Sequence, residues 1–279
     1  MDGLIAPLSY DFMRQALVAS VLVGVLCPVV GTYLMVQRMA MLGDVVAHGV
    51  LPGLALAQVL RLPLLVGAFA MGLCSTVIMA WIRHQSRIKA DTAMAITFST
   101  FFSLGIILLT TLETSLSLEQ VLFGDILSIT PQDLGQIALI TGLVLVGVKA
   151  FYKELLFFTF DPLGAEALGL PVQRLNLGLT AAITLAIIAG IKTVGVILVV
   201  ALMIGPAATA YLLVKELHWM MVGGAGLGVL FGVVGMYGSY YLDLPSGPAI
   251  GLTVFGGFLL ALLFSPRQGI LTRRWRQRE

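Results

Sequence analysis

The stretch Gln15–Gln37 reads QALVASVLVGVLCPVVGTYLMVQ and contains no Asp, Glu, Lys or Arg. A helix of about 20 apolar residues crosses a hydrocarbon core of roughly 30 Å, so this stretch predicts a membrane span. Its apolar part is too long for a signal peptide, and further spans follow it. The whole chain agrees, because 59% of its 279 residues are hydrophobic and only 11% are charged. This balance excludes an ordinary soluble domain.

Further intervals poor in charge predict an all-α fold, a polytopic transmembrane helical bundle of eight or nine spans that forms one domain over residues 1–279. They are Val45–Leu60, Leu62–Ile82, Thr92–Leu112, Leu134–Val148, Leu175–Ile191, Thr193–Val214, Leu217–Leu242 and Leu244–Pro266.

The basic residues predict which way the bundle faces. With nine spans, thirteen of the sixteen Lys and Arg residues fall on one side, and only Arg14, Arg61 and Lys192 fall on the other. Short cytoplasmic loops carry the excess of basic residues, so we expect the C-terminus in the cytoplasm and the N-terminus outside. The run Arg273-Arg274-Trp275-Arg276 after the last span is typical of an anchor to membrane lipid rather than of a nucleic-acid site.

Asp44 and His48 stand four residues apart at the start of the second predicted span. This spacing places both side chains on one helix face, with Cβ atoms about 6 Å apart, where a carboxylate and an imidazole can share one ion. A carboxylate inside the membrane is costly unless it faces a water-filled path, a partner or a metal. Pro52 cannot donate a hydrogen bond to the carbonyl of His48, which leaves that oxygen free. Together these donors suit Mn²⁺, Fe²⁺ or Zn²⁺.

Two structural interpretations of the pair stay open: an ion pair that fixes helix packing, or an N-cap role for Asp44. Two ligands cannot complete a coordination shell, but a two-fold dimer would supply four. The remaining polar residues are weaker candidates: His84 in a basic loop, His218 as an anchor beside Trp219, Lys192, Asp125 and Asp243 in outer turns, and Cys27 and Cys74 as packing residues.

Residues 161–170 predict a short cytoplasmic helix between two spans. Asp161 is suited to the N-cap and Pro162 to the first position, while Gly169 and Pro171 stand at and beyond the end. Two turns are marginal alone, so the helix needs the membrane surface or another protein to pack on. No G-x-x-x-x-G-K-[ST] motif occurs, so energy from a nucleotide has to arrive through another subunit.

Several motifs follow one another along nearly the whole chain, and together they resemble the membrane permease subunit of manganese/zinc/iron ABC importers, the ABC-3 family. They are Gly43-Asp44, His48, Leu51-Pro52-Gly53, Phe123-Gly124-Asp125, Thr130-Pro131-Gln132-Asp133-Leu134, Phe160-Asp161-Pro162, Leu168-Gly169-Leu170-Pro171, Thr193-Val194-Gly195-Val196-Ile197-Leu198, Gly205-Pro206-Ala207-Ala208-Thr209-Ala210 and Leu244-Pro245-Ser246-Gly247-Pro248. The chain departs from the family in two ways: it carries Ile204-Gly205-Pro206 where many relatives have Ile-Pro, and the family is usually described with fewer spans than nine.

The resemblance implies a homodimer in the bacterial inner membrane, with a cytoplasmic ABC ATPase on each protomer and an extracytoplasmic metal-binding protein that delivers the ion. Asp44 and His48 would then lie on the translocation path of a transported divalent metal, with Mn²⁺ favoured over Zn²⁺ or Fe²⁺. The chain itself would perform no bond chemistry and hold no permanent cofactor. The residues implied to contact the ATPase are Asp161, Pro162, Leu163, Glu166, Ala167 and Leu170.

The mechanism that we expect is alternating access, with Pro52 and Pro206 as flexing points of their helices. The alternative is an ATP-independent secondary metal transporter or proton-coupled transporter that uses Asp44 as its protonatable group. An intramembrane hydrolase is excluded, because neither H-E-x-x-H nor G-x-S-x-G occurs.

Overall fold

The computed structural model describes residues 9–112, 118–124, 126–265 and 269, and the regular structure within these ranges is helical. Nine helical segments of this described part are long and apolar enough to cross a membrane, which confirms the predicted bundle. They are α2 (Asp11–Val36), α3 (Leu42–Val59), α4 (Leu64–Gln85), α5 (Ala90–Thr111), α7 (Pro131–Ala150), two arms of α10 (Val172–Leu213), α11 (Leu217–Leu242) and α12 (Ser246–Phe264).

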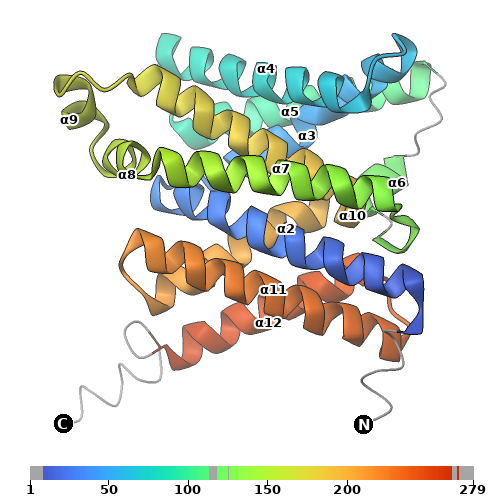
Figure 1. Cartoon of the computed structure of the whole chain (residues 1–279). Coiled ribbons are helices and arrows are strands. Elements are labelled where there is room, and N and C mark those ends of the chain that lie inside the picture. Colours follow the sequence, from blue (N-terminus) through green and yellow to red (C-terminus); the bar gives the residue numbers. More distant parts are fainter. Residues whose placement is uncertain (1–8, 113–117, 125, 266–268, 270–279) are drawn as a thin grey trace, which may run out of the picture.

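The spans form three groups that are visible in Figure 1. Helix α3 packs against α4 and α5 on one side of the bundle, while α2 and α10 lie in the middle with α7. Helices α11 and α12 pack on each other and on the middle group. The metal-binding candidates on α3 therefore belong to one flank of the bundle.

Helix α10 turns back on itself at Gly195, which has the non-helical dihedrals φ 76° and ψ 166°. A Cβ atom added to Gly190 would meet the side chain of Val199, although nine residues of straight helix span about 13 Å. The two arms therefore lie side by side as a hairpin. They correspond to the separate spans predicted over 175–191 and 193–214.

The turn of this hairpin rests on the short segment that links α6 (Leu118–Phe123) and the 3₁₀ helix η2 (Ile126–Ser128). Gly124 and Gly195 both have positive φ, and their backbones touch. A Cβ atom on Gly195 would lie only 2.5 Å from the carbonyl oxygen of Leu122. The contact therefore requires glycine on both sides, for the backbone angle and for the close approach.

Small residues also bring α2 and α11 together. Pro28 lies inside α2 and cannot donate a hydrogen bond to the carbonyl of Gly24. That carbonyl points at Gly228 of α11, where a Cβ atom would collide with it and would also lie 2.8 Å from Pro28 Cγ. Such close approach of backbones stabilises helix pairs in lipid, where apolar side chains give little driving force.

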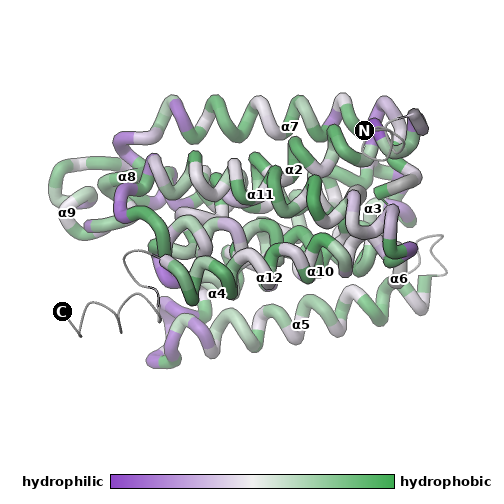
Figure 2. Tube along the Cα trace, turned by 90° about the horizontal axis from the view of Figure 1, so that it is seen from below, coloured by the Kyte–Doolittle hydropathy of each residue, from purple (hydrophilic) through white to green (hydrophobic). Residues whose placement is uncertain are grey.

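Basic residues gather at one end of the bundle, which we call the basic end. Figure 2 shows hydrophilic segments there, near α8 (Tyr152–Phe160) and at the turn between α4 and α5, and α9 (Pro162–Ala167) lies at the same end. The up-and-down order of the spans brings these basic residues together: Arg38, Arg83, Arg87, Lys89, Lys149, Lys153, Arg174 and Lys215. The tail from residue 270 onward, which contains the predicted lipid anchor, lies outside the described residues.

Helix α9 confirms the short helix expected near residues 161–170. The Asp161 carboxylate accepts a hydrogen bond of 2.9 Å from the backbone N–H of Gly164, which caps the helix. Gly169 ends the segment with a φ of 79°. Leu163 is 79% exposed and Leu168, at the C-cap of α9, is 74% exposed, so this segment has an uncovered apolar surface. Figure 1 shows α9 at the edge of the bundle, next to α8.

Candidate metal centre

Asp44 lies in the first turn of α3, at the basic end of the bundle. The N-cap of α3 is Met41, with no side-chain hydrogen bond to the helix, so the interpretation of Asp44 as an N-cap is wrong. A carboxylate in the first turn is nevertheless favoured by the positive end of the helix dipole. His48 follows one turn later on the same face, as the spacing predicts.

Asp44 and His48 are the residues through which this part of α3 reaches the molecular surface. From Leu42 to Gly53 every other residue of the helix is buried, while these two are half-buried. A lipid-facing helix exposes apolar side chains, whereas this part of α3 buries them and exposes only a carboxylate and an imidazole. Ionisable side chains inside spans rarely face acyl chains, so this face of α3 is suited to a partner or a water-filled path.

The His48 ring has a defined hydrogen bond. Nδ1 lies 3.1 Å from the backbone carbonyl oxygen of Asp44. Because a carbonyl oxygen only accepts, Nδ1 carries the hydrogen and donates, which leaves the lone pair of neutral His48 on Nε2. The hydrogen bond joins the imidazole to the backbone rather than to the carboxylate, so it does not support the alternative interpretation of an ion pair. Both side chains keep donor atoms for a cation.

Two phenyl rings of α5 contact the imidazole of His48. The His48 ring centroid is 4.6 Å from that of Phe98 and 5.0 Å from that of Phe102, in edge-to-face geometry at 79° and 85°. The two phenyl rings are stacked on each other with centroids 5.9 Å apart. The imidazole therefore stands beside the two stacked rings, in contact with both.

Close contacts with neighbouring helices fix α3 in place. Added Cβ atoms would strike Ser75 of α4 from Gly49 and the α4 backbone at Gly67 from Gly53. On the α5 side, a Cβ atom on Gly105 would lie 2.6 Å from Leu51 Cβ and 3.3 Å from Pro52 Cδ. Backbone-level packing of this kind sets the register of α5, and so places its phenylalanines beside His48.

The pair alone would not complete the coordination sphere of a metal ion. Within the described residues, no group of three or more His, Cys, Asp or Glu side chains could hold a metal ion. Asp44 and His48 supply one carboxylate and one imidazole, so further ligands have to come from backbone, water or a second copy. Helix α3 continues through Pro52, and the second arm of α10 continues through Pro206.

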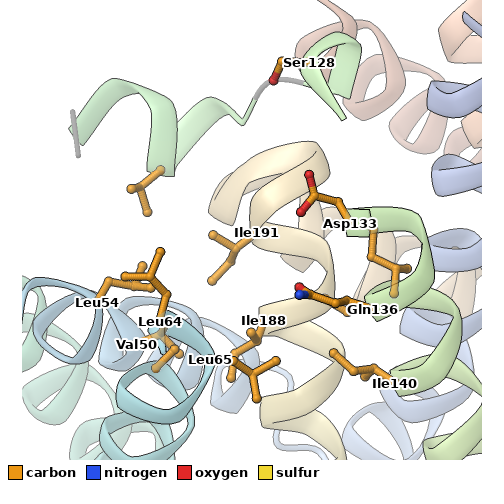
Figure 3. A pocket seen from close by; sticks show the side chains of 14 residues that line it. Val50, Leu54, Leu64, Leu65, Ser128, Asp133, Gln136, Ile140, Ile188 and Ile191 are labelled. Carbon is orange, nitrogen blue, oxygen red and sulfur yellow. The ribbon is translucent and has the colours of Figure 1, made fainter. Parts of the chain in front are cut away.

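Two cavities lie away from this pair. One of about 360 Å³ lies between α3, α4, α7 and α10, where Figure 3 shows Gln136 reaching from α7 toward Ile188. It touches α3 at Val50 and Leu54, on the other side of the helix from His48. The other, of about 740 Å³, opens at the basic end and is bordered by Arg83 and Pro162. Neither cavity is lined by Asp44 or His48.

The other polar candidates lie apart from the pair. His218 Nε2 lies 3.4 Å from Glu216 Oε2 and its ring touches Trp219, as expected for an anchor at the helix end. Asp243 caps α11 in the left-handed conformation. His84 is exposed, Cys27 is buried and Cys74 is half-buried, whereas Asp125 and the side chain of Lys192 are not among the described parts of the chain.

Residues 9–265 of the chain match the ABC 3 transport family. The chain belongs to this family. It is 39% identical over 99% of its length, and 98% of the relative, to the manganese transport system membrane protein MntC of Listeria monocytogenes. It is 37% identical to a probable iron transport system membrane protein of Haemophilus influenzae, over 98% of this chain and 97% of the relative. A chain in the solved structure of PsaBC from Streptococcus pneumoniae in complex with Fab is similar with a TM-score of 0.89 and 33% identity, covering 100% of this chain and 99% of that one.

Family membership confirms the resemblance read from the motifs and makes the chain a multi-pass membrane permease subunit. It is not an enzyme, because ATP hydrolysis belongs to a separate subunit of such transporters. The alternative of an ATP-independent secondary transporter finds no support in this assignment. The sequence did not single out Phe98 and Phe102: their spacing of four residues places them on one helix face, but only the register of α5 brings that face to His48.

Proposed function

We propose that the protein forms a homodimeric permease that moves Mn²⁺ into the cytoplasm by alternating access, with Asp44 and His48 binding the passing ion. The observation that carries this proposal is the surface of α3, where only these two side chains emerge between Leu42 and Gly53. A polar pair at the surface of a membrane span is stable when another protein or a water-filled path covers it. A second copy related by a two-fold axis would provide both, together with two more ligands.

The two donor groups, a carboxylate and an imidazole, indicate which metal the site would prefer. One carboxylate and one imidazole without a thiolate suit Mn²⁺ or Fe²⁺ somewhat better than a dedicated Zn²⁺ site. Relatives point the same way, since the similar protein of Listeria monocytogenes is named for manganese transport and that of Haemophilus influenzae for iron transport. Fe²⁺ is the second candidate on this evidence, and Zn²⁺ the third.

Each end of the bundle would contact a different partner protein. The basic end would lie in the cytoplasm, because basic residues are retained there. Helix α9 at this end would contact the ABC ATPase through Leu163, with Asp161, Pro162, Glu166, Ala167 and Leu170 in the same segment. An extracytoplasmic metal-binding protein would dock at the opposite end, and bending at Pro52 and Pro206 would accompany the change of access.

The test is ATP-dependent uptake of Mn²⁺ by the permease reconstituted in liposomes with its ATPase and its binding protein. Asp44→Asn and His48→Ala should each reduce uptake about tenfold or more, as expected when a metal ligand is lost. Matched controls are Asp11→Asn, at the start of α2, and His218→Ala, at the start of α11, which should leave uptake close to that of the unmodified complex.

Parallel assays with Zn²⁺ and Fe²⁺ identify the preferred cargo. Unchanged Mn²⁺ uptake in both Asp44→Asn and His48→Ala would refute the assignment of the site. Uptake that persists without ATP would refute the importer mechanism and restore the secondary-transporter alternative.

A further inference from the structure

The His48 imidazole is held on three sides by groups of this chain. Its Nδ1 donates to the Asp44 carbonyl at 3.1 Å, and its ring meets Phe98 and Phe102 edge to face. A histidine side chain has only two rotatable bonds, so a hydrogen bond and two ring contacts leave the ring little freedom. The orientation of Nε2 is thereby decided before any ion arrives.

We propose that Phe98 and Phe102 are positioning residues that aim Nε2 of His48 at the transported cation. This inference rests on the proposed role of Asp44 and His48 in binding the ion. The stacked phenyl rings form one surface, and the imidazole stands nearly perpendicular to both. Edge-to-face aromatic pairs are stabilising beyond the area that they bury, so the arrangement opposes rotation of the imidazole.

The packing of α5 against α3 determines that the two phenyl rings lie level with His48. Gly105 lets the α5 backbone approach Leu51 and Pro52, one turn beyond His48 on α3. The parallel course of α3 and α5 then brings Phe98 and Phe102 level with the imidazole. The outer contacts of a ligand histidine normally fix its tautomer and its ring plane, and their loss costs about 10- to 100-fold in metal affinity where they are hydrogen bonds.

Phe101 offers a matched control on the same helix. It is only 5% exposed, so its replacement perturbs packing, yet the described ring contacts of His48 are with Phe98 and Phe102. A role in packing alone predicts similar effects of Leu at all three positions. A positioning role predicts an effect on the handling of Mn²⁺ at positions 98 and 102 only.

The experiment measures the KM for Mn²⁺ uptake by the complete transporter in liposomes, with its ATPase and binding protein. Phe98→Leu and Phe102→Leu should each raise KM about threefold to tenfold, the range that loss of one aromatic pair allows. Phe101→Leu should change KM less than twofold. Because only assembled complexes transport, KM does not depend on the yield of folded protein.

A second readout follows the ligand itself. Electron spin echo spectra of bound Mn²⁺ should show nitrogen modulation from an imidazole in the unmodified complex, and Phe98→Leu and Phe102→Leu should weaken it. Phe98→Tyr and Phe102→Tyr keep the ring and should retain the KM and the modulation of the original protein. Leu variants that match Phe101→Leu in KM and keep the full modulation would overturn the positioning role.

The His48→Ala variant separates this proposal from the one on which it rests. If His48→Ala transports Mn²⁺ with an unchanged KM, the assignment of the ion site fails, whatever the phenylalanine variants do. If His48→Ala loses transport while the Phe98 and Phe102 variants behave like Phe101→Leu, the ion site stands and the positioning role fails.

Discussion

Replacing Gly195 by alanine should destabilise the bundle far more than the same change at Gly178, in the first arm of α10. The backbone at Gly195 has φ 76° and ψ 166°, a region open essentially to glycine alone. Forcing a side chain into such a conformation costs of the order of 1–3 kcal/mol. The new Cβ atom would also lie 2.5 Å from the carbonyl oxygen of Leu122, whereas ordinary van der Waals contact begins at 3.4 Å.

The atoms in the way belong to the backbone, so no rotamer change can relieve the clash. The α6–η2 segment would have to retreat by about 0.9 Å, and overpacking of this kind costs roughly 1–3 kcal/mol. The two penalties together predict a loss of about 2–6 kcal/mol in the free energy of unfolding. A membrane domain of ordinary stability would lose much of its margin.

Gly178 is the matched control for this prediction. It lies in the first arm of α10, and an added Cβ atom would meet nothing within 4 Å. Gly178→Ala should therefore be neutral or should stabilise by up to about 1 kcal/mol through helix propensity. The assay is reversible unfolding in mixed micelles with increasing SDS, followed by far-UV circular dichroism.

A third variant tests whether the contact acts as one unit. Gly124→Ala should destabilise like Gly195→Ala, because Gly124 has a φ of 66° and faces the same backbone. The double variant should lose less than the sum, since both changes break one contact. Equal unfolding free energies for Gly195→Ala and Gly178→Ala, within about 0.5 kcal/mol, would refute the reasoning.

Two further predictions concern the basic end. Leu163→Asp should weaken co-purification of the ATPase subunit about tenfold or more, because a leucine that becomes buried at an interface contributes roughly 1.5–3 kcal/mol. Leu163→Met should bind the ATPase normally. Equal binding by both variants would exclude α9 from the interface. In a cysteine-free background, His84→Cys should react in intact cells only with a membrane-permeant maleimide, whereas Asp11→Cys at the opposite end should also react with an impermeant one. The reverse labelling pattern would show that the basic end faces outward.

The spans and the short helix were predictable because their signals are local. Uncharged intervals of the right length predicted eight or nine spans, and the turn expected at Lys192 stands three positions before the reversal at Gly195. Asp161 and Pro162 likewise predicted the start of α9, because helix capping depends on residues that are adjacent in the sequence.

Other features depend on contacts between distant segments and were not predictable from the sequence. The role of Gly195 is hidden among 31 glycines, because its partner Gly124 stands 71 positions away. Helix α8 was missed, since Tyr152–Phe160 mixes charged and aromatic residues in a stretch that resembles a polar loop. The pair of Asp44 and His48 was found by spacing, but the aromatic stack beside it required the register of α5.

The seam between α2 and α11 is built from main chain against main chain at Gly24 and Gly228. Glycine is the smallest residue, so every missense allele at these two codons adds atoms where none can be accommodated, and no conservative exchange exists. Gly226, two residues from Gly228, has open space around an added Cβ atom and should accept alanine and other small apolar residues. A saturation mutagenesis library should therefore separate the glycines of α11 into positions that tolerate substitution and positions that do not. The intolerant positions should include those that contact α2.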